Sequence, residues 1–454
     1  MSGFSRTFMR IAVVGLALVL SAPVVAQQRD LRLLDAVKRR DQKTFNSLIR
    51  AKADVNAAQP DGATALAWAV YLGQRSMAEA LLDVGANANT VDEYGETPVT
   101  LAAANGDGAL VQRLLKAGAK ATAARWNGET ALMIAAGAGS VESVRHLVLH
   151  GADVNAADPR RGQTALMWAA AEGHADVVSA LLEIGADPKA VSKNGFNALA
   201  FAIAKNDASS ARSLIAAGLD PNFLLPSGNR LLMVAMAYGH TEAASVLLEA
   251  GADIRATDRA GSTALHAAAQ AGNLVLVKQL LDKGADPNVR TAQIAMSAAR
   301  GGGGGGRTLV GGALTPLMIA ARANQLEVMK MLVAAGADPK LRADHGTTTL
   351  MYAAAAKLPT VTYAYEIDPN VDVVNQAGQT PMHASVSGGT QRTQDEIVEV
   401  IQFLADKGAK LDELDAAGRT AISLADTSPI DKAVDLLTAL ILKSGSTPKI
   451  PSKR

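Results

Sequence analysis

The chain has 454 residues, of which 49% are apolar and only 4% aromatic, and its 44 basic residues nearly balance 43 acidic ones. The absence of cysteine excludes disulfide bonds, thiolate metal sites and a cysteine nucleophile. The balanced charge gives no electrostatic basis for binding nucleic acid, because such binding depends on neutralising many phosphates.

Residues 1–26 have the order of a cleavable secretory signal. Arg6 and Arg10 form a basic region, an apolar run covers residues 11–20, and the small residues at 24–26 predict cleavage before Gln27. The alternative is an uncleaved membrane anchor. A spanning helix needs roughly 20 apolar residues, and Pro23 lies where it would have to continue. We therefore expect a periplasmic or secreted protein with no stable membrane insertion after cleavage.

Two series of glycines run through the chain with the same period, at spacings of 33 or 34 residues. The first series consists of Gly62, Gly95, Gly128, Gly162, Gly195, Gly228 and Gly261. The second consists of Gly85, Gly118, Gly151, Gly185, Gly218, Gly251 and Gly284. Because the two series share one period, they predict an array of stacked supersecondary units and not one globular core.

Residues 158–190 show what one unit contains. A polar stretch predicts a turn, after which Thr164 is placed to cap a short apolar helix. In a second helix, Val178 and Leu181 fall on one face, and Gly185 supplies the left-handed residue that ends it. Neither helix is long enough to be stable alone, so each pair must pack on its neighbours.

The repeated motifs resemble those of the ankyrin repeat. The closest matches are TALHAA at 263–268, TPMH at 380–383 and GADPN at 284–288. The resemblance implies an all-α solenoid of about twelve helix-turn-helix units with short β-turn tips, and a function in protein–protein recognition. We expect a capping repeat at 27–58 and regular repeats at 59–289 and 314–442, the last ending in a C-terminal cap.

The regular spacing breaks once, because Gly284 and Gly336 lie 52 residues apart. The extra residues fall within 290–313 and include six consecutive glycines, so we expect a flexible insertion. A phosphate-binding loop is the alternative, but it needs Lys followed by Ser or Thr, and Arg307 and Thr308 stand there instead.

The tenth unit is also irregular. Its first helix is predicted at 348–356, whereas Pro359 and Pro369 bracket a weak second helix and Asp368 replaces the closing glycine. Either sequence drift or a hinge between the first eight units and the rest accounts for this. The tail at 443–454 is expected to be disordered.

No catalytic constellation stands out, and we expect neither a cofactor nor a metal ion. His146 and His150 are spaced to share a metal, but no third ligand is near them in sequence. Four other histidines occupy positions where ankyrin repeats often carry a structural histidine, and we expect them to order the turns: His174, His240, His266 and His383.

The few aromatic residues gather at corresponding places in the repeat. One position of the first helix, which the resemblance places toward the concave face, carries several of them, and others lie at the end of that helix or at turn tips. Aromatic side chains dominate interface energetics, so we predict a partner-binding stripe of Trp68, Tyr71, Tyr94, Trp126, Trp168, Phe201, Tyr238 and Tyr352. The alternative is that the helix residues pack between repeats. In that case the partner surface would lie on turn tips such as Arg160 and Phe196.

These features favour a non-enzymatic scaffold in the bacterial periplasm that binds a protein partner through its concave face and turn tips. Two alternatives remain open. The first is a secreted host-directed effector or a toxin or immunity protein, and the second is an accessory subunit of an envelope enzyme.

Overall fold

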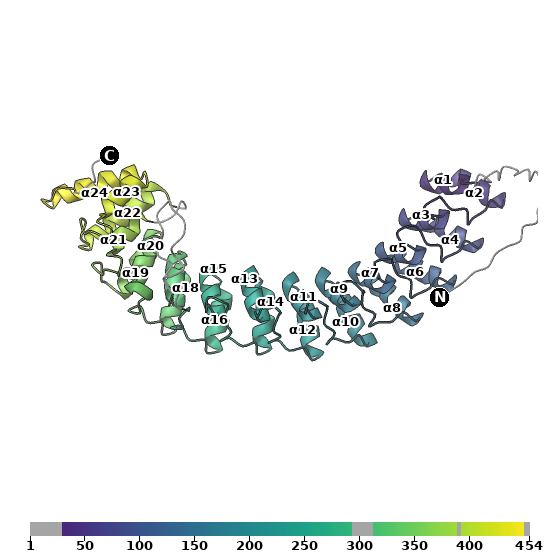
Figure 1. Cartoon of the computed structure of the whole chain (residues 1–454), viewed down its shortest axis with the longest axis horizontal. Coiled ribbons are helices and arrows are strands. Elements are labelled where there is room, and N and C mark those ends of the chain that lie inside the picture. Colours follow the sequence, from purple (N-terminus) through teal and green to yellow (C-terminus); the bar gives the residue numbers. More distant parts are fainter. Residues whose placement is uncertain (1–29, 293–311, 388–391, 449–454) are drawn as a thin grey trace, which may run out of the picture.

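The computed structural model describes residues 30–292, 312–387 and 392–448, which form a curved stack of helices (Figure 1). The predicted signal at 1–26 and the glycine run at 301–306 lie outside the described residues. Within these ranges there are 24 α-helices, which pair into twelve units. The predicted all-α solenoid is therefore confirmed.

Each unit has a first and a second helix. The first helices are α1 Arg32–Lys38, α3 Ala65–Tyr71, α5 Pro98–Ala104, α7 Ala131–Gly137, α9 Ala165–Glu172, α11 Ala198–Lys205, α13 Leu231–Tyr238, α15 Ala264–Ala271, α17 Pro316–Arg322, α19 Thr349–Ala353, α21 Pro381–Val386 and α23 Ala421–Thr427. The second helices are α2 Gln42–Arg50, α4 Arg75–Asp83, α6 Gly108–Lys116, α8 Val141–Leu149, α10 Ala175–Ile184, α12 Ala208–Ala216, α14 Thr241–Glu249, α16 Leu274–Asp282, α18 Leu326–Ala334, α20 Leu358–Ile367, α22 Gln394–Asp406 and α24 Asp431–Lys443.

The helix ends follow from side-chain caps and glycines. The Thr164 hydroxyl accepts a hydrogen bond from the backbone N–H of Met167, and in α11 the Asn197 side chain does the same for Ala200. At the other end of the unit, Gly185 has a φ of +100° and closes α10. Both predicted devices are thus present, and they fix where each short helix starts and stops.

The core is continuous along the stack. Alanines of the first helices and leucines of the second, such as Ala169 and Leu181, are fully buried and belong to one apolar cluster that runs from the first unit to the last. Figure 1 shows that the first helices of the central units lie on the inner side of the arc and the second helices on the outer side. Within the described part of the chain, every helix falls short of the length and apolar content that crossing a bilayer requires.

The turn tips of neighbouring units are joined through the backbone. The N–H of Glu93 donates to the carbonyl of Asp61 at 2.7 Å, and Lys193 donates to Arg161 at 2.8 Å. Within a tip, isolated antiparallel bridges such as Ala157 with Thr164 close the turn. The tips of these neighbouring units are therefore held together and do not hang free.

Side chains add a second set of links between units. The side-chain oxygens of one series of asparagines accept hydrogen bonds from a backbone N–H of the next unit, at 2.7–2.9 Å: Asn56, Asn89, Asn155, Asn222 and Asn288. The short segment between the two helices of a unit donates back to a carbonyl of the preceding unit through Gln74, Asn105, Ser140, His174, His240 and Arg392. Backbone groups at helix ends thus find partners across the unit boundary.

The stack continues across the predicted insertion. Asn288 accepts from the N–H of Asp338 at 2.8 Å and donates to the carbonyl of Gly336 at 3.0 Å, although about 50 residues separate them. Near the break itself, the N–H of Ala313 donates to the carbonyl of Ala292 at 3.4 Å. Units eight and nine are therefore in the same register as other neighbours.

Two details differ from the sequence expectations. In the tenth unit the second helix α20 is regular and ten residues long, because Pro359 lies in its first turn, where proline is tolerated; the first helix α19 is the short one, with five residues. At the C-terminus, α24 extends through Lys443, and the N–H of Ser446 bonds to Ile441. The predicted disordered tail therefore does not begin at 443, and residues 449–454 lie outside the described part.

Candidate functional site

The structure separates the eight predicted partner-binding residues into three groups. Four are largely exposed: Tyr71 at 59%, Tyr94 at 69%, Trp126 at 73% and Tyr238 at 71%. Trp68, Trp168 and Phe201 are half-buried and pack against the core. Tyr352 is buried, at 8% exposure, so its inclusion in an accessible stripe is wrong.

The burial of Tyr352 has a local cause. It lies on the shortened helix α19, immediately after the turn that contains Asp344 and Thr347. Burial raises the pKa of its phenol, and Arg322 on α17 is close enough to oppose that shift. The repeat register alone placed Tyr352 with the other aromatics, but the turn and the neighbouring unit cover it.

Trp68 is held in one orientation at the N-terminal end of the concave side. Its indole N–H donates to the Gln59 side chain at 3.0 Å, and Lys38 donates to the same oxygen at 3.2 Å while lying 4.1 Å from the ring centroid. The ring of Tyr71 meets it edge-on, with centroids 5.6 Å apart. This arrangement combines a fixed indole, a cation and an exposed phenol, which suits recognition of another surface.

Two other tryptophans are placed by glycines of the preceding unit. Trp126 sits at a turn tip, where its backbone and ring come within 2.6 Å of the position that a side chain on Gly95 would occupy. Trp168 lies over Gly137, and its indole N–H is buried without a hydrogen-bond partner among the described residues. Trp168 therefore packs against the preceding unit while it stays partly exposed.

A hollow of ≈ 500 Å³ lies between the turn tips and the first helices of the sixth and seventh units. Phe196 and Phe201 line it with their ring centroids 6.0 Å apart, and Tyr238 borders it while stacking on His240 at 5.6 Å. Arg161 reaches it from the fifth unit. Phe201 and Tyr238 were predicted, and Phe196 was the predicted alternative; Arg161 was missed because nothing in its turn sequence shows which way it points.

Comparison with protein families supports this architecture over most of the chain. Residues 33–125, 101–192 and 199–291 match a family described as ankyrin repeats (3 copies), and residues 308–356 match one described as ankyrin repeats (many copies). The chain belongs to the ankyrin repeat family. Comparison with curated proteins gave no match.

Membership of the ankyrin repeat family indicates a protein–protein interaction scaffold, and such repeats are typically non-enzymatic. The charged side chains of the described ankyrin units form no group of three or more histidine, aspartate or glutamate residues placed to hold a metal ion. His150, which is spaced to share a metal with His146 but was not expected to do so, contacts the carbonyl of His146 through Nδ1 at 2.8 Å.

The four histidines that were predicted to order the turns link neighbouring ankyrin units. His174 and His240 bond to the carbonyls of Gly137 and Ile203 in the preceding unit, at 3.0 and 2.9 Å. His266 and His383 reach the following unit through Nε2, at 2.9 Å to the carbonyl of Leu314 and at 3.1 Å to that of Arg419. Their hydrogen bonds thus connect neighbouring units.

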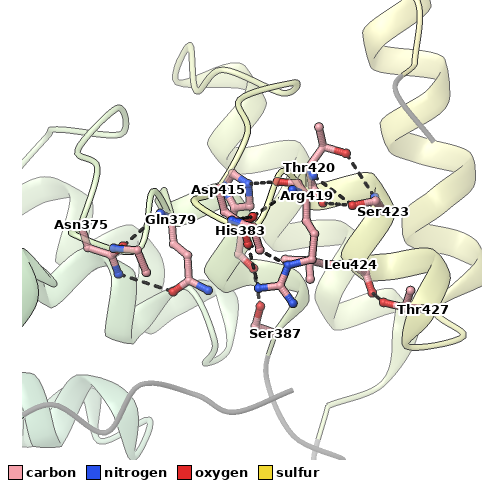
Figure 2. A network of polar contacts seen from close by, with 12 residues as sticks. Asn375, Gln379, His383, Ser387, Asp415, Arg419, Thr420, Ser423, Leu424 and Thr427 are labelled. Atoms are coloured by element: carbon pink, nitrogen blue, oxygen red, sulfur yellow. Dashed lines mark hydrogen bonds and ion pairs between the residues drawn. The ribbon is translucent and has the colours of Figure 1, made fainter. Parts of the chain in front are cut away.

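Figure 2 shows the network around His383. Its Nδ1 accepts from the N–H of Thr380 at 3.2 Å, so Nε2 carries the proton that is donated to Arg419. The Arg419 side chain in turn pairs with Asp415 at 2.8 Å, and the Asp415 carboxylate accepts the backbone N–H of Arg419 at 2.9 Å. His266 makes the matching pair of contacts, with Thr263 and Leu314. Each site thus requires the neutral imidazole.

This requirement predicts acid sensitivity. Burial is the main cause that lowers the pKa of both His266 and His383 in the folded protein, outweighing their hydrogen bonds to backbone carbonyls. Below pH 6.5, which is about the pKa of histidine in the unfolded chain, these histidines bind protons in the unfolded state but not in the folded state. The free energy of unfolding is therefore highest above that pH and falls below it. We expect each histidine to remove up to about 1.4 kcal/mol per pH unit until its folded pKa is reached.

The measurement is the free energy of unfolding between pH 7.5 and 5, above the range in which ordinary carboxylates titrate. Thr100 occupies the corresponding position in α5 and receives the cap N–H without an imidazole. The double variant His266→Thr/His383→Thr should therefore be less stable at pH 7.5 but show a flatter pH dependence. An unchanged slope would show that these two sites do not cause the acid sensitivity.

Proposed function

We propose that this ankyrin array is an exported scaffold of the bacterial periplasm that binds a protein partner through its concave side and turn tips. The observation that carries the proposal is the exposure of Tyr71, Tyr94, Trp126 and Tyr238 in a chain with few aromatic residues. Aromatic side chains that remain exposed on a rigid stack supply contact area at low entropic cost.

Export is proposed from the sequence of residues 1–26, in which a basic region, an apolar run and small residues follow one another. We expect mass spectrometry of the protein recovered from cells to find the N-terminus at or near Gln27, in the periplasmic fraction. The matched control changes Arg6 and Arg10 to glutamate, which should slow processing. Recovery of a chain that keeps Met1 in the cytoplasm would contradict the proposal.

The partner surface is tested by affinity capture from envelope extract. Trp126→Ala and Tyr238→Ala should each weaken binding to the captured partner by at least tenfold, which is about 1.4 kcal/mol, and should leave the melting temperature nearly unchanged because both side chains are exposed. Leu149→Ala is the control, since Leu149 is 79% exposed on the second helix α8. Equal losses for all three variants would place the partner elsewhere.

A further inference from the structure

The hollow between the sixth and seventh units has a lining of unusual composition. Phe196, Phe201 and Tyr238 give it an aromatic wall, and the apolar side chains of the first helices α11 and α13 form its floor. Arg161 is the one charged residue of the lining, and no acidic residue contributes to it. The hollow therefore offers apolar contact area beside a positive charge.

The cationic side chains around the hollow form no salt bridge within the described part of the chain. Arg161, Lys193 and Arg259 form no ion pair there; Lys193 donates to the carbonyl of Pro159 at 2.5 Å, and Arg259 to that of Ser227 at 3.5 Å. Asp158 interacts electrostatically with Arg161, but it is 5% exposed and its carboxylate accepts the backbone N–H groups of its own turn, at 2.6 Å from Arg161 and 2.8 Å from Gln163. A carboxylate from outside would find these cations free to pair.

Side-chain amides around the same hollow also lack partners. Gln163, Asn194 and Asn229 all line it, and their amide groups make no hydrogen bond within the described chain. An amide both donates and accepts, which matches the alternating N–H and C=O groups of a peptide backbone. A free inorganic anion would use only the donors, so the amides favour a peptide over a phosphate or sulfate.

We infer that this hollow is the anchor site for an acidic segment of the protein partner. The segment places an aromatic or large aliphatic side chain against Phe201 and Tyr238, a neighbouring Asp or Glu beside Arg161, and its backbone against the three amides. The inference rests on the proposed function and specifies it further, because it names the chemistry of the partner segment and the repeat units that bind it.

The experiment is selection of a displayed random twelve-residue peptide library on the purified full chain, followed by affinity measurement with synthetic labelled peptides. We expect enriched peptides to carry an apolar residue within three positions of Asp or Glu. Arg161→Glu and Phe201→Ala should each weaken their binding at least tenfold, whereas Arg212→Glu should change it less than twofold. Arg212 pairs with Glu249 on the second helices and serves as the matched charge control.

A charge swap makes the test specific to the predicted pairing. Replacing the acidic residue of a selected peptide by lysine should abolish binding to the wild-type chain and restore part of it to Arg161→Glu. Circular dichroism melting of each variant separates loss of binding from loss of folding. Selected peptides that ignore Arg161 and Phe201, a basic consensus, or failure to enrich any peptide would overturn the inference. Selected peptides whose binding depends on Trp126 instead would also overturn the inference, but they would remain consistent with the proposed function.

Discussion

Leu147→Ala is expected to lower the free energy of unfolding by about 2–5 kcal/mol, the range for large-to-small changes in a packed core. Leu147 is fully buried in the second helix α8, in the apolar cluster that joins neighbouring units. Removing its branched end leaves a cavity that short helices can relax into only partly, because each is held by links to the units on both sides.

The matched control lies two residues along the same helix. Leu149 is 79% exposed, so Leu149→Ala removes the same atoms without opening a cavity and should change stability by less than about 0.5 kcal/mol. Chemical unfolding followed by circular dichroism gives both values. Equal losses for the two variants would mean that burial in α8 does not control the stability of the array.

Gly62→Ala is expected to destabilise the protein by roughly 3 kcal/mol or more, in contrast to Gly228→Ala. Both glycines occupy the same place in the turn and have left-handed φ values, +89° and +84°, so both variants carry about 1–2 kcal/mol of backbone strain. At Gly62, however, a Cβ atom would lie 2.7 Å from the carbonyl oxygen of Val91 and 3.1 Å from the Cα of Asp92. At Gly228 no atom lies within 4 Å.

The additional loss at Gly62 comes from the contact between adjacent turn tips. The two turn tips must move apart to relieve the overlap between the new Cβ atom and the Val91 backbone. This movement weakens the hydrogen bond from the N–H of Glu93 to the carbonyl of Asp61. Thermal and chemical unfolding of the two variants should therefore differ by at least about 1 kcal/mol. If both lose the same amount, backbone conformation alone explains these glycines, and the close approach of the tips does not matter.

Much of the fold followed from sequence because it depends on local chemistry repeated at a fixed interval. Thr164 and Gly185 mark the beginning and the end of a unit by capping and by left-handed backbone, and both act within a few residues of their own position. The same reasoning recovers the twelve helix pairs. It also assigned structural roles to His266 and His383, which bond as expected.

The candidate surface was harder to predict because it depends on how units meet. Tyr352 and Trp168 share a position in the repeat, yet one is covered by its own turn and the other remains partly exposed over Gly137. Arg161 belongs to the hollow only because the tip of the fifth unit reaches the side of the sixth. A single sequence period contains no information on these approaches, which vary with the length of each turn and with the side chains beside it.

The hydrogen bond between Ala292 and Ala313 means that the chain leaves and re-enters the array at one point. Units eight and nine are also joined on either side of that point, by the bond from the N–H of Asp338 to Asn288 and by the bond from His266 to the carbonyl of Leu314. Lengthening a loop whose ends are already together costs little, since each doubling adds only about 0.6 kcal/mol. This position is therefore a natural place to graft a folded reporter domain with adjacent termini, or to shorten the chain to a tight turn, without disturbing the stack on either side.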